Sequence, residues 1–317
     1  MRLAAIVEPD AVRAAAAAKE WGVPVFSSVP EFLAARTRDE IACGAASVCT
    51  PTSAHAEVAE ALLGAGLDVL VEKPIAATTA EADRLVDVAA RNGRILQTGH
   101  LERFNPAVAA AGSILNQPMF FEAHRLSVFS PRSLDVDVVL DLMVHDLDIV
   151  LSLVRSPIRS LHAVGLPILS PKVDIANVRI EFESGCVANF TASRVSTERV
   201  RKLRFFQPHQ YVSIDYARQD LLVIDVSGAA KADPAQMAAA AMAGGAGLPG
   251  LNIQKPPVTQ GEPLRLEIES FLECVRTRSA PRVSGEDGRA ALAVALEIHA
   301  AMAAHAKRAG LDRYVRP

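Results

Sequence analysis

The regular alternation of apolar and helix-forming segments over residues 1–100 constrains the fold more than any other feature of the chain. Short apolar runs typical of buried strands occupy residues 2–7, 45–49, 69–71 and 94–98. Helix-forming runs lie between them at residues 11–21, 54–63 and 81–91, the last opened by the capping-box pattern Thr78-x-x-Glu81. Strands that alternate with helices pair in parallel, because each helix carries the chain back to the edge where the next strand begins. We therefore predict an α/β domain with a parallel sheet.

A different pattern begins after residue 101. Apolar and polar residues alternate over residues 174–182 and 186–192, on either side of a short turn that contains Gly185, which is typical of a hairpin with one buried face. Further strand-like runs occupy residues 200–206, 210–216 and 221–226. Residues 101–317 are thus predicted to form a second α/β domain with an open-faced, mostly antiparallel sheet, on which a helix from Asp141 packs.

The last part of the chain combines a low-complexity stretch with two helices. Residues 228–262 are rich in alanine, glycine and proline, which favours a surface excursion. The spacing of apolar residues predicts helices over 264–275 and 286–308. We place His299 and His305 of the final helix on a solvated face.

Composition excludes several classes of function. The 317 residues suffice for two domains with sizeable cores, and a hydrophobic content of 50% with a net charge of −3 is ordinary for a globular protein. No basic patch indicates nucleic-acid binding, no apolar run is long enough to span a bilayer, and no signal peptide opens the sequence, so we expect a cytoplasmic protein. The scattered cysteines have neither metal-ligand nor disulfide spacing, and no metal site is predicted.

The segment from Asp135 to Asp148 is the strongest candidate for chemistry, because it sets several acids and a histidine in an apolar frame. On a helix, Asp141 and His145 share one face about one turn apart. A carboxylate so placed can orient an imidazole and raise its basicity, as a general base requires. The alternative is that Asp141 caps the helix and His145 is a hydrogen-bonded core residue, and for an isolated motif that alternative is the more frequent one.

Three further candidates follow predicted strands of the first domain, at the edge where open α/β sheets bind ligands. Glu8 follows the first strand, where an acid accepts hydrogen bonds from the adenosine ribose and repels a 2′-phosphate, which favours NAD over NADP. Thr50 precedes a helix whose N-terminus could hold an anionic ligand. Each fits an ordinary loop acid or helix cap as well.

Glu72-Lys73-Pro74 ends the next strand at the same edge. A lysine there is a positive charge able to stabilise a developing alkoxide, and the proline is a candidate for a cis peptide. The alternative is a solvated lysine at a strand end, but Glu-Lys-Pro at this place is more specific than the preceding signals.

The order and spacing of these motifs resemble the Gfo/Idh/MocA family of NAD(P)-dependent oxidoreductases along nearly the whole chain. The segments that carry the resemblance are Cys49-Thr50-Pro51 with His55, Glu72-Lys73-Pro74, Gly99-His100 with Arg103-Phe104-Asn105-Pro106, and Asp141-x-x-x-His145. Within the family, residues 99–106 and 135–148 are most similar to UDP-N-acetylglucosamine 3-dehydrogenases.

The resemblance implies a Rossmann-like domain over residues 1–100 and a substrate-binding and oligomerisation domain over residues 101–317. It implies that Lys73, Asp141 and His145 are catalytic and also contact the substrate. Glu8, Thr50, Pro51, His55 and Glu72, together with Lys73, would bind NAD, and His100, Arg103 and Asn105 would lie where cofactor and substrate meet, with Asn105 on the substrate side.

The implied reaction oxidises the C3 hydroxyl of the sugar. His145 takes the hydroxyl proton, Asp141 steadies the imidazolium, Lys73 stabilises the alkoxide, and the nicotinamide accepts the hydride. A UDP diphosphate requires cations, and Arg194 is the chosen candidate in a basic group that also contains Arg199, Arg201 and Lys202, although this group fits a solvated edge nearly as well. The open sheet face suggests a homo-oligomer.

The sequence departs from the family at its start. Family members begin with a strand and a Gly-x-Gly-x-x-Gly turn into a helix, and here neither is present. In the usual strand order that strand is central, so either its two neighbours close up on each other or Met1 is an internal residue of a longer protein; we favour the second. Without the glycine-rich turn, NAD affinity is expected to be poor or nil.

Two other functions compete with a nucleotide-sugar dehydrogenase. The same chemistry could act on a free sugar or inositol, because the motifs define hydride transfer better than they define the alcohol. The chain could also be a non-catalytic sugar-binding relative that has lost cofactor binding, against which the intact Lys73, Asp141 and His145 argue.

Overall fold

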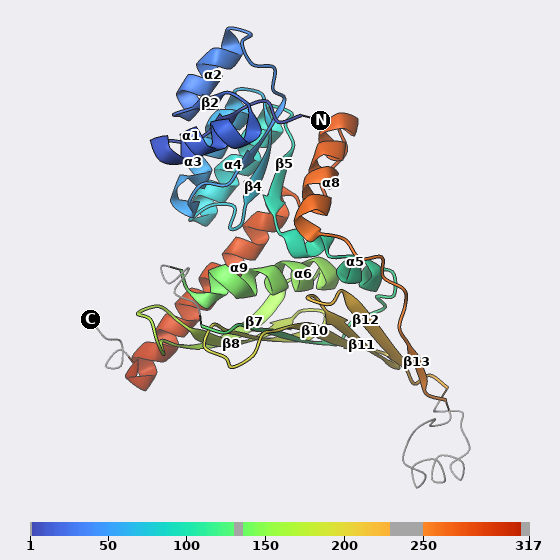
Figure 1. Cartoon of the computed structure of the whole chain (residues 1–317). Helices are drawn as coiled ribbons and strands as arrows, with labels where there is room; N and C mark the ends of the chain where they lie inside the picture. The colour runs from blue at the N-terminus through green and yellow to red at the C-terminus, as the bar shows by residue number, and fades with distance from the viewer. Residues whose placement is uncertain (1, 130–135, 229–249, 312–317) are drawn as a thin grey trace, which may run out of the picture. The chain divides into compact units, whose positions relative to one another are not determined.

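The structure is a computed structural model that describes residues 2–129, 136–228 and 250–311 (Figure 1). The chain divides into two compact units, Met1–His100 with Glu267–Leu292, and Leu101–Leu266 with Ala293–Pro317. The sequence-based division placed residues 267–292 in the second domain, and this part of the prediction is wrong. Phe271 and Cys274 pack with Leu70 and Ile95 of the first unit, a contact between segments about two hundred residues apart in the sequence.

The first unit contains the predicted alternation of strands and helices, with every strand pair parallel. A two-stranded sheet joins β1 (Ile6–Val7) to β2 (Val25–Phe26), and a three-stranded sheet has the order β3 (Ala45–Val48), β4 (Asp68–Glu72), β5 (Leu96–Gly99). The helices are α1 (Ala11–Trp21), α2 (Val29–Thr37), α3 (Thr52–Gly64), α4 (Thr79–Arg91) and α8 (Pro263–Thr277).

Two features of this unit bear on the sequence analysis. The capping box that opens α4 is confirmed, since the side chains of Thr78 and Glu81 each accept a hydrogen bond from the other residue's backbone N–H. β1 and β3, the two neighbours of the central strand in the family's order, belong to different sheets and do not pair with each other in the described residues.

The second unit is built on an eight-stranded sheet in the order β13-β12-β11-β10-β6-β9-β8-β7, in which only β6 and β9 pair in parallel. The strands are β6 (Phe120–Leu126), β7 (Ile158–Leu166), β8 (Ile175–Phe182), β9 (Val187–Ser193), β10 (Val200–Gln207), β11 (Gln210–Asp215), β12 (Asp220–Asp225) and β13 (Asn252–Gln254). The predicted fold class and the hairpin around Gly185 are confirmed.

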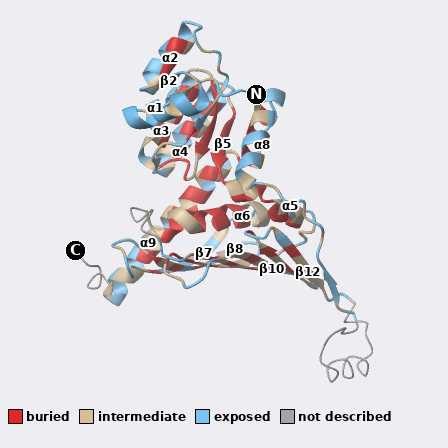
Figure 2. Cartoon of the chain, in the orientation of Figure 1, coloured by how far each residue is buried: buried red, intermediate tan, exposed pale blue. Residues whose placement is uncertain are grey.

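Helices cover one face of this sheet: α5 (Pro106–Gly112), α6 (Val144–Val154) and the C-terminal part of α9 (Gly285–Ala309) (Figure 1). A short 3-10 helix, η1 (Leu101–Phe104), precedes α5. Strand alternation sends Phe121, Phe190 and Phe205 toward the helices, where they are buried with Leu147 and Ile298. Figure 2 shows α6 buried over most of its length. The mostly apolar α6 is therefore the centre of the core, and the polar residues that it carries are buried too.

The structure alters three smaller expectations. Within residues 228–262, positions 229–249 lie outside the described residues, and Asn252–Gln254 form the edge strand β13, which was not predicted. The helices predicted over 264–275 and 286–308 are confirmed as α8 and α9. The solvated face proposed for His299 is wrong, because its Nε2 lies 2.9 Å from Oδ2 of the half-buried Asp137. Of the helices described, none is long and apolar enough to cross a membrane.

Candidate active site

The carboxyl ends of β3 and β4 form the candidate cofactor edge of the first unit. Thr50 lies just before α3, and its hydroxyl is buried without a hydrogen-bond partner among the described residues. The N-cap of α3 is Pro51, whose side chain cannot accept hydrogen bonds from the first N–H groups of the helix. A buried hydroxyl and an uncapped helix N-terminus are together suited to a polar or anionic ligand.

His55 lies one turn into α3, is 1% exposed and links two loops of this edge. Its Nδ1 is 2.8 Å from the carbonyl oxygen of Pro74, and its Nε2 is 2.8 Å from the carbonyl oxygen of Thr50. Because both ring nitrogens are directed at main-chain carbonyls, the ring fixes the loops after β3 and β4 relative to each other. In the structure His55 therefore positions these loops, whereas the resemblance implied that it contacts the cofactor.

Lys73 follows the last residue of β4 and is half-buried, and the peptide bond to Pro74 is cis, as the sequence suggested. Its neighbour Glu72 lies opposite Gly99 of β5 in the sheet register. A Cβ atom at Gly99 would stand 3.1 Å from the Cα atom of Glu72, so glycine permits a close approach of the two strands. The buried His100 follows directly. Lys73 thus extends from the end of a tightly packed strand pair.

Glu8 follows β1 and already has partners. Its carboxylate accepts hydrogen bonds from the Arg13 guanidinium at 3.0 Å and from the backbone N–H of Asp10 at 2.9 Å. The hydrogen bond from Arg13, and then that from Asp10, lower the pKa of Glu8. Glu8 therefore stays ionised, as its predicted role at the ribose requires.

In the second unit, Asp141 and His145 lie on one continuous helix. Asp141 is in η2 (Val139–Met143), a single π-helical stretch that leads directly into α6, and the 9% exposed His145 is in the first turn of α6. The alternative that Asp141 caps the helix is wrong. The carboxylate of Asp137 performs that task, accepting from the N–H groups of Val139 at 2.8 Å and Leu140 at 3.3 Å.

The residue after His145 enters a buried ionic network centred on Arg125 of β6. The Arg125 guanidinium donates to both carboxylate oxygens of Asp146 at 2.7 and 3.0 Å and to Glu102 of η1 at 3.0 Å, and it lies 5.0 Å from the ring centre of Tyr216. Burial alone would lower the pKa of Arg125, but Asp146 and then Glu102 outweigh it and raise that pKa. Burial, followed by the charge of Asp146, raises the pKa of Tyr216. The network holds η1, β6 and α6 together beside His145.

Arg103 and Asn105, both proposed for the cofactor and substrate side, also make contacts within the unit. Arg103 pairs with Asp148 of α6 at 3.7 Å. The amide oxygen of Asn105 caps α5, and its nitrogen donates to Glu102 at 3.2 Å and to the carbonyl of Tyr216 at 3.0 Å. Asn105 thus helps to hold Glu102 and Tyr216 of the network in place.

Arg125, Glu102, Asp146 and Tyr216 were not among the residues selected from the sequence. One signal could have found the first of them. Arg125 falls in the buried register of the alternating strand Phe120–Leu126, and a charged residue at such a position requires a partner.

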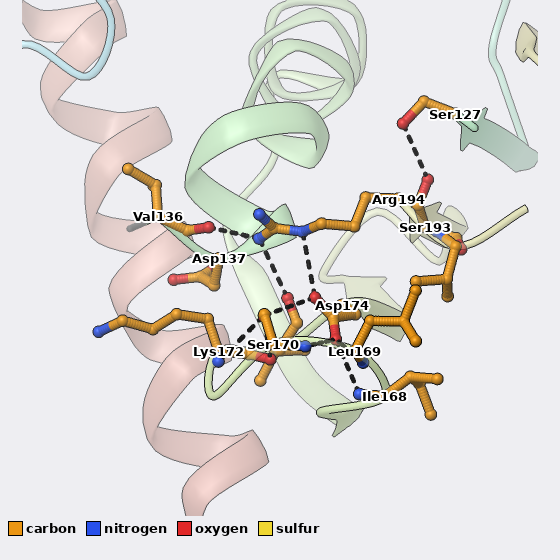
Figure 3. A network of polar contacts seen from close by, with 12 residues as sticks. Ser127, Val136, Asp137, Ile168, Leu169, Ser170, Lys172, Asp174, Ser193 and Arg194 are labelled. Carbon is orange, nitrogen blue, oxygen red and sulfur yellow. Dashed lines mark hydrogen bonds and ion pairs between the residues drawn. The ribbon is translucent and has the colours of Figure 1, made fainter. Parts of the chain in front are cut away.

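Arg194, the chosen candidate for the diphosphate, belongs to a separate network (Figure 3). Its guanidinium donates to the carbonyl of Val136 and to that of Val173 at 3.4 Å, and lies 3.4 Å from Asp174. Asp174 in turn accepts from the Ser170 hydroxyl and from the N–H groups of Ile168, Leu169 and Ser170. Arg194 is 5% exposed and directed at protein acceptors, so the structure does not support its assignment to the diphosphate.

Comparison with known proteins defines the class of molecule. The units have the fold of a two-domain oxidoreductase that binds a nicotinamide cofactor: the NAD-binding Rossmann domain of the oxidoreductase family Gfo/Idh/MocA matches residues 1–100, and the C-terminal domain of that family matches residues 114–207. The chain belongs to the Gfo/Idh/MocA family, which confirms the assignment made from the motifs.

Individual members of the family are similar to this chain over most or part of its length. The chain is 35% identical over 310 residues to UDP-N-acetylglucosamine 3-dehydrogenase of Acidithiobacillus ferrooxidans, covering 97% of this chain and 92% of the relative. The solved structure of GnnA, the dehydrogenase of that name from this organism, superposes with a TM-score of 0.83 at 34% identity, covering 95% and 90% of the two chains. Scyllo-inositol 2-dehydrogenase (NAD(+)) of Bacillus subtilis is 27% identical over 62% of this chain and 60% of its own.

Proposed function

We propose that this chain is an NAD-dependent dehydrogenase that oxidises the C3 hydroxyl of UDP-N-acetylglucosamine. The observation that carries the proposal is the 35% identity to a UDP-N-acetylglucosamine 3-dehydrogenase over 97% of the chain. The inositol dehydrogenases among the relatives match about half to two thirds of it. Similarity that extends through both units favours the nucleotide sugar, because the matches to the inositol dehydrogenases leave a large part of the chain uncovered.

The edge formed by β3, β4 and β5 fits a nicotinamide cofactor. The buried Thr50 hydroxyl and the uncapped start of α3 at Pro51 leave polar groups for a ligand to satisfy. We assign Glu8, Thr50, Pro51, Glu72, Lys73 and His100 to the cofactor side, with His55 fixing the loops that carry them. The ionised Glu8 favours NAD over NADP, since it would repel a 2′-phosphate. When bound, the nicotinamide supplies the hydride acceptor.

The chain's own residues would manage the proton and the developing charge. His145 takes the proton of the C3 hydroxyl, and Asp141, on the same continuous helix, orients the ring and stabilises the imidazolium. The ammonium group of Lys73 stabilises the alkoxide. Bidentate pairing of Asp146 with Arg125 fixes the rotation of the helix and thereby the direction of the His145 side chain.

The face of the eight-stranded sheet opposite the helices supports the proposal of a homo-oligomer. Phe120, Phe206 and Tyr211 form an aromatic cluster there, with ring centres 5.7 and 5.2 Å apart, and Phe206 is 39% exposed. An exposed aromatic cluster on a sheet face is typical of a surface that a second copy covers. A cytoplasmic location is part of the same proposal.

Turnover by the chain fused at its N-terminus to the family's glycine-rich strand and turn tests the proposal. UDP-N-acetylglucosamine with NAD should yield reduced nicotinamide, and free N-acetylglucosamine and myo-inositol should yield far less. His145→Ala and Lys73→Met should each lower kcat by about a hundredfold or more, whereas Lys19→Met, on the exposed face of α1, should match wild type. Faster oxidation of myo-inositol would replace the proposed substrate. Absence of NAD binding in a calorimetric titration of the chain completed with the family's glycine-rich strand and turn would favour the non-catalytic relative.

A further inference from the structure

Two arginines stand directly opposite each other on the helix-covered face of the eight-stranded sheet. Arg125 of β6 pairs in register with Arg201 of β10. Both follow the alternation that sends Ala123 and Leu203 into the core, so both side chains leave the sheet on the same side. Like charges directly opposite each other on one sheet face are destabilising. Retaining such a pair requires that negative charge compensate both members.

Within the described residues, Arg125 is fully compensated and Arg201 is not. Arg125 has the carboxylates of Asp146 and Glu102, as described above. Arg201 is half-buried, and its side chain makes no hydrogen bond or ion pair with any residue of the described chain. Burial, then the charge of Arg125, lowers the pKa of Arg201, and the attraction of Glu102 and Asp146 does not offset this. An anion placed against Arg201 would remove an existing electrostatic cost.

The other cations of this region do not share these properties. Lys202 leaves the sheet on the opposite face and lies 3.9 Å from Asp215. Arg194 is enclosed in the Asp174 network. Arg199 precedes Arg201 by two residues and is exposed. Its positive charge contributes to the lowered pKa of Arg201. Among the basic residues that the sequence placed near a diphosphate, Arg201 is therefore the one that combines partial burial with an uncommitted guanidinium.

The surroundings of Arg201 connect it to the candidate catalytic helix. The backbone N–H of Tyr216 donates to the carbonyl of Arg201 at 3.0 Å, and the ring of Tyr216 packs against Arg125. Arg125 in turn holds Asp146, the residue that follows His145. The backbone of Arg201 is thus fixed by the same network that orients the start of α6.

We propose that Arg201 binds the diphosphate of the nucleotide-sugar substrate. The inference rests on the proposed function, because that substrate class carries a phosphate group beside the sugar. A guanidinium presents two parallel N–H groups that match two phosphate oxygens, and bound phosphate would offset the repulsion between Arg125 and Arg201. Arg125 then acts as the fixed, neutralised support and Arg201 as the ligand-binding member of the pair.

Calorimetric titration with UDP tests the assignment without requiring cofactor or turnover. Arg201→Gln should weaken UDP binding by about tenfold or more, the usual loss for a charged hydrogen bond, and Arg201→Lys should fall between this variant and wild type. Arg155→Gln, which removes the same charge from the exposed end of α6, should stay within about twofold of wild type. In the absence of ligand, Arg201→Gln should melt at the same temperature as wild type or higher, because it removes a repulsion; a structural arginine would give a lower melting temperature.

The outcomes separate this inference from the proposed function. If wild type binds no UDP, or if Arg201→Gln binds it as tightly as wild type does, the inference is overturned. Oxidation of UDP-N-acetylglucosamine with Arg201-independent UDP binding would overturn the inference alone. Arg201-dependent UDP binding by a chain that binds NAD but does not oxidise that sugar would support the phosphate site and reject the proposed substrate.

Discussion

Arg125 and Arg194 are both buried, with 4% and 5% exposure, and both pair with carboxylates in the same unit, yet their surroundings differ. Arg125 is the principal donor to two carboxylates and joins three elements beside His145. Arg194 shares its carboxylate with a loop, since Asp174 accepts four other hydrogen bonds from residues 168–170. We therefore expect the stability lost on removal of a buried arginine to depend on which other hydrogen-bond donors its acceptors keep.

The comparison is tested most strongly by Arg125→Met. Removal of Arg125 leaves Asp146 and Glu102 buried without their main counter-charge, which should lower the free energy of unfolding by about 3–5 kcal/mol. Urea unfolding of the full chain measures this change. Arg125→Lys keeps the charge but cannot bridge both carboxylates with a planar fork, so its loss should be smaller but clear. A loss for Arg125→Met no larger than that for an exposed arginine would contradict the role given to the network.

Arg194→Met should cost less, about 1–3 kcal/mol, because it leaves two carbonyls and one carboxylate short of a donor while Asp174 keeps its other hydrogen bonds. The same urea experiment measures this loss. The comparison is tested by the ratio of the two losses in unfolding free energy, for Arg194→Met and Arg125→Met, more than by either loss alone. Equal losses for the two variants would show that the loop donors around Asp174 do not compensate for the missing guanidinium.

The pH dependence of Asp174→Asn refines the account of the Arg194 network. Burial would raise the pKa of Asp174, but the Ser170 hydroxyl and the backbone N–H groups of residues 168–170 outweigh it and lower that pKa. A carboxyl with a lowered folded-state pKa stabilises the fold above its unfolded pKa of about 3.9, and the effect disappears as the pH falls through the folded value. The stability gap between wild type and Asp174→Asn should therefore be largest near neutral pH and shrink below about pH 4. A gap that widens toward acid would contradict the ionised state.

The sequence predicted the elements with strong local signals. The Thr78 capping box, the hairpin around Gly185 and the Asp141–His145 helix depend on residues a few positions apart, and the structure contains all three. It missed β2, a strand of only two residues that gives no periodicity to detect, and it also missed α2, α5, β6 and β7. Local pattern therefore sufficed for the fold class, but it did not locate every element.

The candidate site was less accessible from sequence, because its partners are distant in the chain. Arg125 bonds Glu102 and Asp146, 23 and 21 residues away, and no spacing rule distinguishes it from Arg194. Arg125 lies in β6, and Arg194 directly follows β9. Only the folded chain shows which carboxylates each one reaches, and for the same reason Arg194 was preferred to Arg201 as the phosphate ligand.

The exposed pair Glu273–Arg276 on α8 supplies the smallest expected effect and the baseline for the comparison. The Arg276 Nε lies 2.9 Å from the Glu273 carboxylate, closer than the 3.4 Å between Arg194 and Asp174. Its side chains are 66% and 55% exposed, however, so water and salt screen the attraction and each partner is well solvated alone. Glu273→Gln should leave the urea midpoint indistinguishable from wild type at physiological salt. A loss comparable to that of Arg194→Met would mean that contact distance, rather than the solvation lost by the partners, determines the strength of these ion pairs, and the ranking of the Arg125 and Arg194 networks would then have no basis.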